Sequence, residues 1–206
     1  MLALLMAGGK GERLGYVSVE KPLVEVSGKP LVAYVVAALI KSQIESIVVI
    51  TSPHTPCTTR WARSACLPLL IAPGLGYIYD YTWAMKRLGL QGPVLIISAD
   101  LPLITHQLID RIIEHQAQVE SPALGVYLPS SFFDEADVST DLVTRAGGEL
   151  LVPSGINIVD ASLPDQLQQE TMLVIRDESL LYNINKRSDL KRLIRKVGEA
   201  NHKKQK

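Results

Sequence analysis

The chain has few cysteines, few aromatic residues and no excess charge of either sign, and each shortage excludes a class of protein. Its two cysteines, Cys57 and Cys66, form no CxxC pair, and the four histidines are scattered without zinc spacing. A disulfide framework or a zinc site is therefore not expected. The 21 basic and 21 acidic side chains cancel, which disfavours a general binder of nucleic acid or anionic membrane. Any phosphate binding must be local.

Long apolar runs are missing as well. No stretch approaches the roughly 18 residues of a membrane span, and residues 1–7 lack the charged start of a signal peptide. We therefore expect a cytoplasmic protein without a transmembrane segment. With 206 residues, of which 47% are hydrophobic, the chain is expected to form a single domain over residues 1–200. Residues 201–206 are expected to be a basic, frayed tail.

What the chain does contain is a glycine-rich loop near its start. An apolar run at residues 2–7 predicts a buried strand, and the following residues 8–15 hold four glycines with Lys10 and Arg13 among them. Glycine lets successive backbone N–H groups turn toward an anion, and the two cations add charge that backbone dipoles lack. This combination predicts a pocket for a polyphosphate.

Two familiar phosphate motifs do not fit this loop. A P-loop requires Ser or Thr after its lysine, whereas Lys10 is followed by Gly11. A dinucleotide fingerprint requires Gly-x-Gly-x-x-Gly; Gly9 and Gly11 fit, but Gly15 comes one residue late. The alternative is a flexible surface turn that is merely rich in glycine.

The hydrophobic pattern of the first hundred residues alternates between strands and helices. The predicted strands lie at residues 2–7, 46–51, 67–72 and 94–98, and the predicted helices at 31–41, 57–66 and 78–88. Such alternation predicts an α/β fold with a mostly parallel, Rossmann-like sheet flanked by helices on both faces. Ligands bind at the carboxyl ends of strands in such sheets. We therefore expect the glycine loop, the loop 51–52, the loop 74–76 and Asp100 to share one rim.

Beyond residue 120 the pattern is weaker. It predicts a strand at 123–128, a turn at residues 147–148, strands meeting at a Pro/Gly bend within 150–159, short strands at 172–175 and 181–184, and a last helix around 190–197.

Asp100 and Lys21 are the main candidates for chemistry outside the loop. A carboxylate directly after a buried strand suits Mg²⁺, which takes oxygen ligands and bridges phosphates, although Asp100 could instead cap the next helix. The amide oxygen of Asn185 could complete the metal shell, or it could be a satisfied turn amide. Lys21 lies beside the rigid Pro22 and is expected to contact phosphate, with a solvated surface lysine as the alternative.

Groups for covalent catalysis are missing. No Ser-His-Asp or Cys-His arrangement is present, and His54 and His106 are expected to be surface residues. This favours a reaction that depends on positioning and charge neutralisation, as in phosphoryl-type transfer. Lys10, Arg13 and Lys21 are then the candidate catalytic residues.

Several motifs resemble a known family. The sequence Met6-Ala7-Gly8-Gly9-Lys10-Gly11-x-Arg13-x-Gly15, followed by Lys21-Pro22-Leu23, resembles the MobA-like nucleotidyltransferase superfamily. Later motifs make the chain similar to archaeal-type adenosylcobinamide-phosphate guanylyltransferases: Thr51-Ser52-Pro53-x-Thr55-Pro56, Gly76-Tyr77-Ile78-x-Asp80, Val152-Pro153-x-Gly155-Ile156-Asn157 and Asn183-Ile184-Asn185. The resemblance covers nearly the whole chain.

This resemblance implies a nucleotide-diphospho-sugar transferase-like fold and transfer of GMP from GTP to the phosphate of adenosylcobinamide phosphate, a step of cobalamin biosynthesis. The implied partners are GTP and a corrinoid phosphate. Mg²⁺ is the expected cofactor, and the balanced charge disfavours nucleic acid as a partner. By position, the implied nucleotide-binding residues are Ala7, Gly8, Gly9, Lys10, Gly11, Arg13, Lys21, Ser52, Gly74, Gly76 and Asp100. The implied metal ligands are Asp100 and Asn185, and the acceptor-side residues are Gly155 and Asn157.

The sequence leaves some points open. Glu12 places an acid inside the phosphate loop, and a second carboxylate ligand is missing unless Asp80 or Asp177 reaches the site. The rival functions are molybdenum-cofactor guanylyltransferase, another nucleotidyltransferase, and a non-catalytic GTP-binding regulator. A dinucleotide-dependent oxidoreductase is disfavoured by the glycine register. The oligomeric state is open, with a homodimer among the options.

Overall fold

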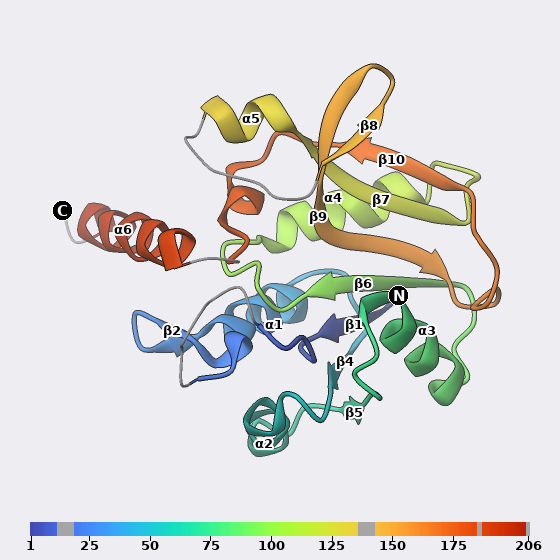
Figure 1. Ribbon diagram of the computed structural model, residues 1–206, viewed down its shortest axis with the longest axis horizontal. Helices are drawn as coiled ribbons and strands as arrows, with labels where there is room; N and C mark the ends of the chain where they lie inside the picture. Colours follow the sequence, from blue (N-terminus) through green and yellow to red (C-terminus); the bar gives the residue numbers. More distant parts are fainter. Residues whose placement is uncertain (12–18, 136–142, 185–186, 205–206) are drawn as a thin grey trace.

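The structure, a computed structural model, describes residues 1–11, 19–135, 143–184 and 187–204. In these residues a mixed sheet is flanked by helices on both faces (Figure 1). Its eight strands within the described ranges are β1 (Leu2–Met6), β4 (Ser46–Thr51), β5 (Leu69–Ile71), β6 (Pro93–Ser98), β7 (Ala123–Pro129), β8 (Thr144–Ala146), β9 (Glu149–Asp160) and β10 (Glu170–Val174). The expected Rossmann-like α/β architecture is confirmed.

Helices and short elements connect these strands. The helices are α1 (Leu31–Lys41), α2 (Pro56–Ser64), α3 (Tyr77–Leu88), α4 (His106–Gln116), α5 (Ser130–Glu135) and α6 (Arg187–Lys204). The 3₁₀ turns η2 (Lys21–Leu23) and η3 (Glu178–Tyr182) and the hairpin β2 (Glu25–Val26) with β3 (Lys29–Pro30) complete the described elements. Thr105 caps α4, because its side chain accepts a hydrogen bond from the Leu108 N–H.

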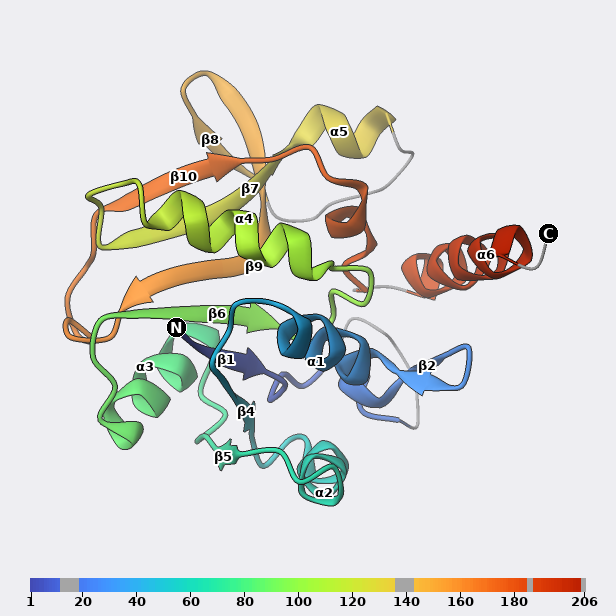
Figure 2. The ribbon, with the colours of Figure 1, turned by 180° about the vertical axis from the view of Figure 1, so that it is seen from behind.

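The first half of the sheet is parallel, as the alternation predicted. The strand order is β10-β7-β9-β6-β1-β4-β5, and β1 pairs in parallel with both β4 and β6. Successive side chains of β1 point to opposite faces: Leu4 belongs to the apolar cluster around α3, and Leu5 to the cluster around α1 and α4. Helices α1 and α4 lie together on one side of the sheet (Figure 2). Burial on both faces leaves the strand ends as the place for a ligand.

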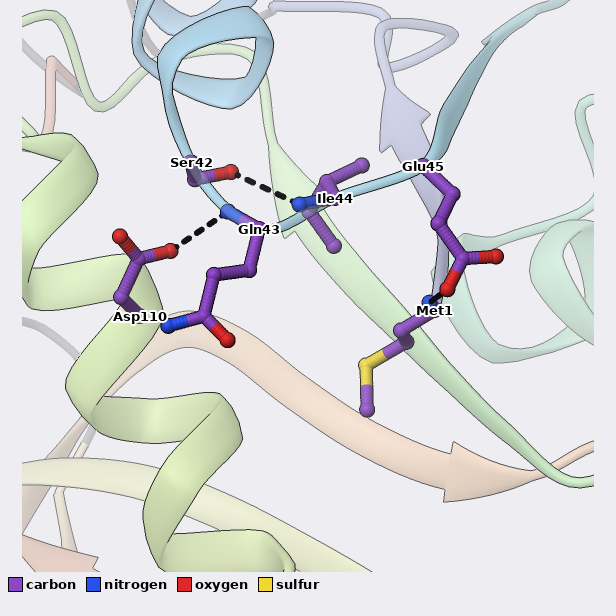
Figure 3. A network of polar contacts seen from close by, with 6 residues as sticks. All are labelled: Met1, Ser42, Gln43, Ile44, Glu45 and Asp110. Carbon is purple, nitrogen blue, oxygen red and sulfur yellow. Dashed lines mark hydrogen bonds and ion pairs between the residues drawn. The ribbon is translucent and has the colours of Figure 1, made fainter.

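A polar network fixes the start of β1 against its neighbours (Figure 3). The amine of Met1 pairs with Oε1 of Glu45, the residue before β4, at 2.6 Å. Two residues earlier, the Gln43 N–H donates to Asp110 Oδ1 of α4 at 2.7 Å. These contacts link the start of β1 to the segment before β4 and that segment to α4, while the register of β1 is set by its ladders with β4 and β6.

The second half of the sheet differs from the expectations in two places. Residues 150–159 lie in one strand, β9, rather than in two, because the Pro/Gly bend is a register shift against β7 between Gly125 and Tyr127. Strand β9 runs antiparallel between β6 and β7. The strand predicted at 181–184 is wrong: the 3₁₀ turn η3 lies there, and Asp177 caps it by accepting from the Ser179 N–H at 2.9 Å.

The C-terminal helix packs on the β2–β3 hairpin. Leu193 of α6 is buried in one cluster with Val24, Val26 and Ile184. The helix runs to Lys204, so it includes most of the segment predicted as a tail. Among the described residues, no helix combines the length and apolarity needed to cross a membrane.

Candidate active site

A cavity of about 430 Å³ opens at the carboxyl ends of the central strands. Its walls come from the loop after β1, from the loop between β5 and α3, and from the end of β6. The predicted residues that lie on these walls are Ala7, Gly8, Gly9, Lys10, Gly74, Gly76 and Asp100. The structure therefore brings the separate strand-end segments to one rim, as parallel strands require.

Gly8 lets the loop after β1 approach the end of β4. A Cβ atom at Gly8 would lie 3.1 Å from both Ser52 Cβ and the carbonyl carbon of Thr51, closer than side chains normally pack. The Ser52 hydroxyl donates to the Gly8 carbonyl oxygen at 2.6 Å and also accepts from the His54 N–H at 3.1 Å. Ser52 is 1% exposed. It therefore holds the loop from behind, and His54 takes a place on the cavity wall.

Lys21 and Asp100 form an ion pair beside this loop. Lys21 Nζ donates to Asp100 Oδ2, and each side chain is 16% exposed. Gly11 has a φ of +66°, and a Cβ atom on it would lie 3.2 Å from Lys21 Cβ. Gly11 thus allows the loop to pack against Lys21. The lysine predicted to contact phosphate lies next to the carboxylate predicted to bind metal.

Two buried oxygens near this pair have no hydrogen-bond partner among the described residues. They are Asp100 Oδ1 and Asn183 Oδ1. The Ile184 N–H donates to the Asp100 carbonyl oxygen at 3.2 Å, which places the Asn183–Ile184 segment beside Asp100. Carboxylate and amide oxygens are ligands that Mg²⁺ accepts. The predicted residues Arg13 and Asn185 lie outside the described residues.

The described residues contain no group of three or more His, Cys, Asp and Glu side chains that could hold a metal ion. The two carboxylates considered as additional ligands have other partners. Asp80 Oδ1 accepts from the Gly74 and Leu75 N–H groups at 3.0 and 3.2 Å, and Asp177 caps η3. A magnesium ion here would depend on Asp100, amide oxygens, water and the phosphates of a substrate.

Glu20, which the sequence did not single out, anchors the lysine segment. Its two carboxylate oxygens accept from the Cys57 N–H at 2.6 Å, the Thr58 N–H at 2.7 Å and the Thr58 hydroxyl at 2.7 Å, in the first turn of α2. Desolvation by burial opposes ionisation, but these hydrogen bonds outweigh it and lower the pKa of Glu20. Because Glu20 directly precedes Lys21, its anchoring restricts where the Lys21 ammonium can lie.

Tyr77 connects the cavity to the predicted acceptor side. Its hydroxyl donates to the Gly155 carbonyl oxygen at 3.4 Å. Tyr77 is 38% exposed, but desolvation of its hydroxyl raises its pKa; a hydrogen bond with Asn157 lowers that pKa, and the charge of Asp100 raises it further. Tyr77 lines the cavity and contacts both Gly155 and Asn157, so it connects these two residues to the cavity wall. The motif at residues 76–80 was the signal for Tyr77, but spacing alone assigns it no role.

With this geometry in view, comparison with known proteins decides the family. The profile of the MobA-like NTP transferase domain matches residues 3–132. The chain belongs to this family. The matched segment includes the loop after β1, Asp100 and the loop between β5 and α3, and every residue that lines the cavity lies within it.

Two relatives of the MobA-like chain are similar over nearly its full length. An adenosylcobinamide-phosphate guanylyltransferase of Methanocaldococcus jannaschii is 34% identical over 93% of this chain and 94% of the relative. A probable molybdenum cofactor guanylyltransferase of Thermococcus sibiricus is 26% identical over 94% of this chain and 97% of the relative. The expectation of a nucleotidyltransferase is confirmed at the level of the family.

A solved structure supports the fold of the whole MobA-like chain. CMP:2-keto-3-deoxy-manno-octonic acid synthetase, complexed with CTP, superposes with a TM-score of 0.68 and covers 97% of this chain and 98% of its own. The sequences are 11% identical, so this likeness concerns the fold alone. It confirms the nucleotide-diphospho-sugar transferase-like architecture.

Proposed function

We propose that this protein transfers GMP from GTP to the phosphate of adenosylcobinamide phosphate, giving adenosylcobinamide-GDP and pyrophosphate. The observation that carries the proposal is the 34% identity to an adenosylcobinamide-phosphate guanylyltransferase over 93% of the chain. That similarity extends well beyond residue 132, where the family profile ends, into the part of the chain expected to hold the acceptor. The expected cytoplasmic location stays a prediction.

The proposed transfer is a single displacement at phosphorus. An oxygen of the acceptor phosphate attacks the α-phosphorus of GTP, and the bond from that phosphorus to the bridging oxygen breaks, so that pyrophosphate leaves with the electron pair. Such a reaction needs aligned anions and neutralised charge rather than a nucleophile from the protein. We assign Lys10, Arg13 and Lys21 to the triphosphate. Removing one such preorganised donor typically lowers the rate about 10²–10³-fold.

The Lys21–Asp100 pair suits exchange of partners during this reaction. With the two charges paired, neither is left unbalanced at the mouth of the cavity. A magnesium triphosphate offers each group a new partner, an anion for Lys21 and a cation for Asp100. We assign Mg²⁺ to Asp100 with an amide of residues 183–185; when bound, the ion would draw charge from the phosphates. Asn183 has the buried, unpartnered oxygen that fits this role.

The test is pyrophosphate release by the purified protein supplied with GTP and magnesium. We expect release with adenosylcobinamide phosphate and none with GTP alone. Molybdopterin is the comparison acceptor, because a probable molybdenum cofactor guanylyltransferase is also similar over the full length. Turnover with molybdopterin alone would contradict the proposal, and GTP binding without release under any acceptor would indicate a non-catalytic regulator.

A further inference from the structure

One face of the second half of the sheet is open. Leu124, Val126 and Leu128 of β7 belong to the core cluster on the α4 side, so the residues between them point to the opposite face. Helix α4 lies over the first side in Figure 2, whereas Figure 1 shows no helix of the described residues over β7 and β10 on the other. On that open side, Met172 and Val174 of β10 are 40% and 42% exposed.

The open face carries an ordered aromatic and acidic pair. A Cβ atom on Gly125 would lie 2.6 Å from Tyr127 Cε2 and 2.7 Å from Glu170 Cδ, so the glycine lets both side chains lie across the strand. The Tyr127 hydroxyl donates to Glu170 Oε1 at 2.7 Å. Burial and this hydrogen bond raise the pKa of Tyr127 to about 12. The Tyr127 hydroxyl is thus anchored to Glu170, and a ring carbon lies over Gly125.

This face is continuous with the cavity. The ring of Tyr77, which lines the cavity, meets the ring of Tyr81 edge to face at 5.7 Å between centroids. The Tyr77 hydroxyl also donates to the Gly155 carbonyl oxygen of β9, and β9 pairs with β7, the strand that carries Tyr127. Asn157 of β9 lies between the cavity and the open face, because it pairs with Ile96 of β6 on one side and with Gly125 of β7 on the other.

The strand order separates this face from the expected nucleotide position. The residues assigned to GTP follow β1, β4 and β5, which lie on one side of β6 in the order of the sheet. Strands β9, β7 and β10 lie on the other side, and Asp100 directly follows β6 between them. A group that must reach the α-phosphate without displacing the nucleotide would approach from the β9 side.

We propose that this open surface binds the ring-bearing body of the acceptor, an inference that rests on the proposed function. We call it the acceptor face and define it by five residues: Tyr127, Asn157, Glu170, Met172 and Val174. Met172 and Val174, which pair with Gly125 and Tyr127 of β7, form with the Tyr127 ring a surface that suits a broad, partly apolar ring system. The Glu170 carboxylate and the Asn157 amide suit amide groups at its edge. The acceptor phosphate would then reach the cavity past Tyr77.

The decisive variant is Met172→Glu, which puts a charge on an exposed position without removing core packing. Its matched control is Ile40→Glu, which adds the same charge to an exposed position of α1 and is 66% exposed in the unchanged protein. Two measurements are needed: the KM values for GTP and for adenosylcobinamide phosphate by pyrophosphate release, and direct binding of that acceptor by quenching of intrinsic fluorescence. If Met172→Glu does not fold, Val174→Glu replaces it.

We expect Met172→Glu to raise the acceptor KM and dissociation constant by about tenfold or more, as loss of one central contact typically does. The KM for GTP stays unchanged, and Ile40→Glu changes neither value. If the KM and the dissociation constant for the acceptor are unchanged in Met172→Glu, the acceptor face is wrong. It is also wrong if sedimentation shows that Met172→Glu changes the oligomeric state and that this change explains the whole loss of binding. If the unchanged protein binds the acceptor but releases no pyrophosphate, the proposed function is wrong. In that case, weaker binding of the acceptor by Met172→Glu would still support the acceptor face.

Discussion

Gly8 shows how a single missing side chain can shape the candidate site. Gly8→Ala would force a Cβ to within 3.1 Å of Ser52 and Thr51, where the neighbours are partly backbone and cannot turn away. We expect a loss of about 1–3 kcal/mol in the free energy of unfolding and a higher KM for GTP, measured by urea titration and by pyrophosphate release. Gly9→Ala is the matched control, because nothing lies within 4 Å of a Cβ there. Equal effects of both variants would contradict this steric role.

Glu20 acts through its charge at the start of α2. Glu20→Gln removes a carboxylate that accepts three hydrogen bonds, and we expect a loss of about 0.5–2 kcal/mol in unfolding free energy at pH 7. The pKa of Glu20 is lower in the fold than in the unfolded chain, so its stabilisation is present above the unfolded pKa near 4.5 and is lost as the pH falls through the folded pKa. Denaturant titrations from pH 7 to pH 3 should show the two proteins converging.

Glu20 also bears on catalysis, because Lys21 follows it. We expect kcat of Glu20→Gln to fall while the KM for the acceptor stays constant. A fall in kcat without any change in the pH dependence of stability would point to a direct contact with substrate instead.

At the scale of elements, the loop between β5 and α3 depends on one buried carboxylate. Asp80 is 6% exposed, and its Oδ1 accepts from two loop N–H groups. Asp80→Ala leaves both donors unpaired, which we expect to destabilise the fold by about 1–3 kcal/mol and to weaken GTP binding, measured by calorimetry. Asp80→Asn keeps an oxygen acceptor and should lose much less. Unchanged GTP affinity in Asp80→Ala would remove this loop from the nucleotide site.

The elements of the first half were predictable because their signals are local. The helix predicted at 31–41 is α1 with the same bounds, and the strand at 46–51 is β4. The second half depends on pairing between distant segments: β9 inserts antiparallel between β6 and β7, which no periodicity of its own indicates. The short apolar run at 181–184 matches a strand and a 3₁₀ turn equally well, and the cap at Asp177 decides between them.

At the scale of the whole molecule, the site likewise combines features that are local in the sequence with features that depend on distant segments. Glycines and cations after a strand were visible in the sequence, because a phosphate loop is built from consecutive residues. The partner of Lys21 was not, since Asp100 is 79 positions away and reaches it only through the parallel order of β1 and β6. The anchoring roles of Glu20 and Asp80 were not predicted for a related reason: each carboxylate accepts from backbone donors, which leave no mark on residue type, and Asp80 was considered only as a metal ligand.

Linkage between ligand binding and folding gives a test at this largest scale. A ligand that binds only the folded state adds stability, about 2.7 kcal/mol at a concentration of 100 times its dissociation constant. We expect GTP with magnesium to raise the melting temperature more than GTP with a chelator, because Asp100 Oδ1 has a buried site to offer a cation. Asp100→Asn should keep the fold and the increment from GTP alone but lose the additional increment from magnesium. If the magnesium increment survives in Asp100→Asn, then the ion is held elsewhere and the exchange of partners between Lys21 and Asp100 has no role.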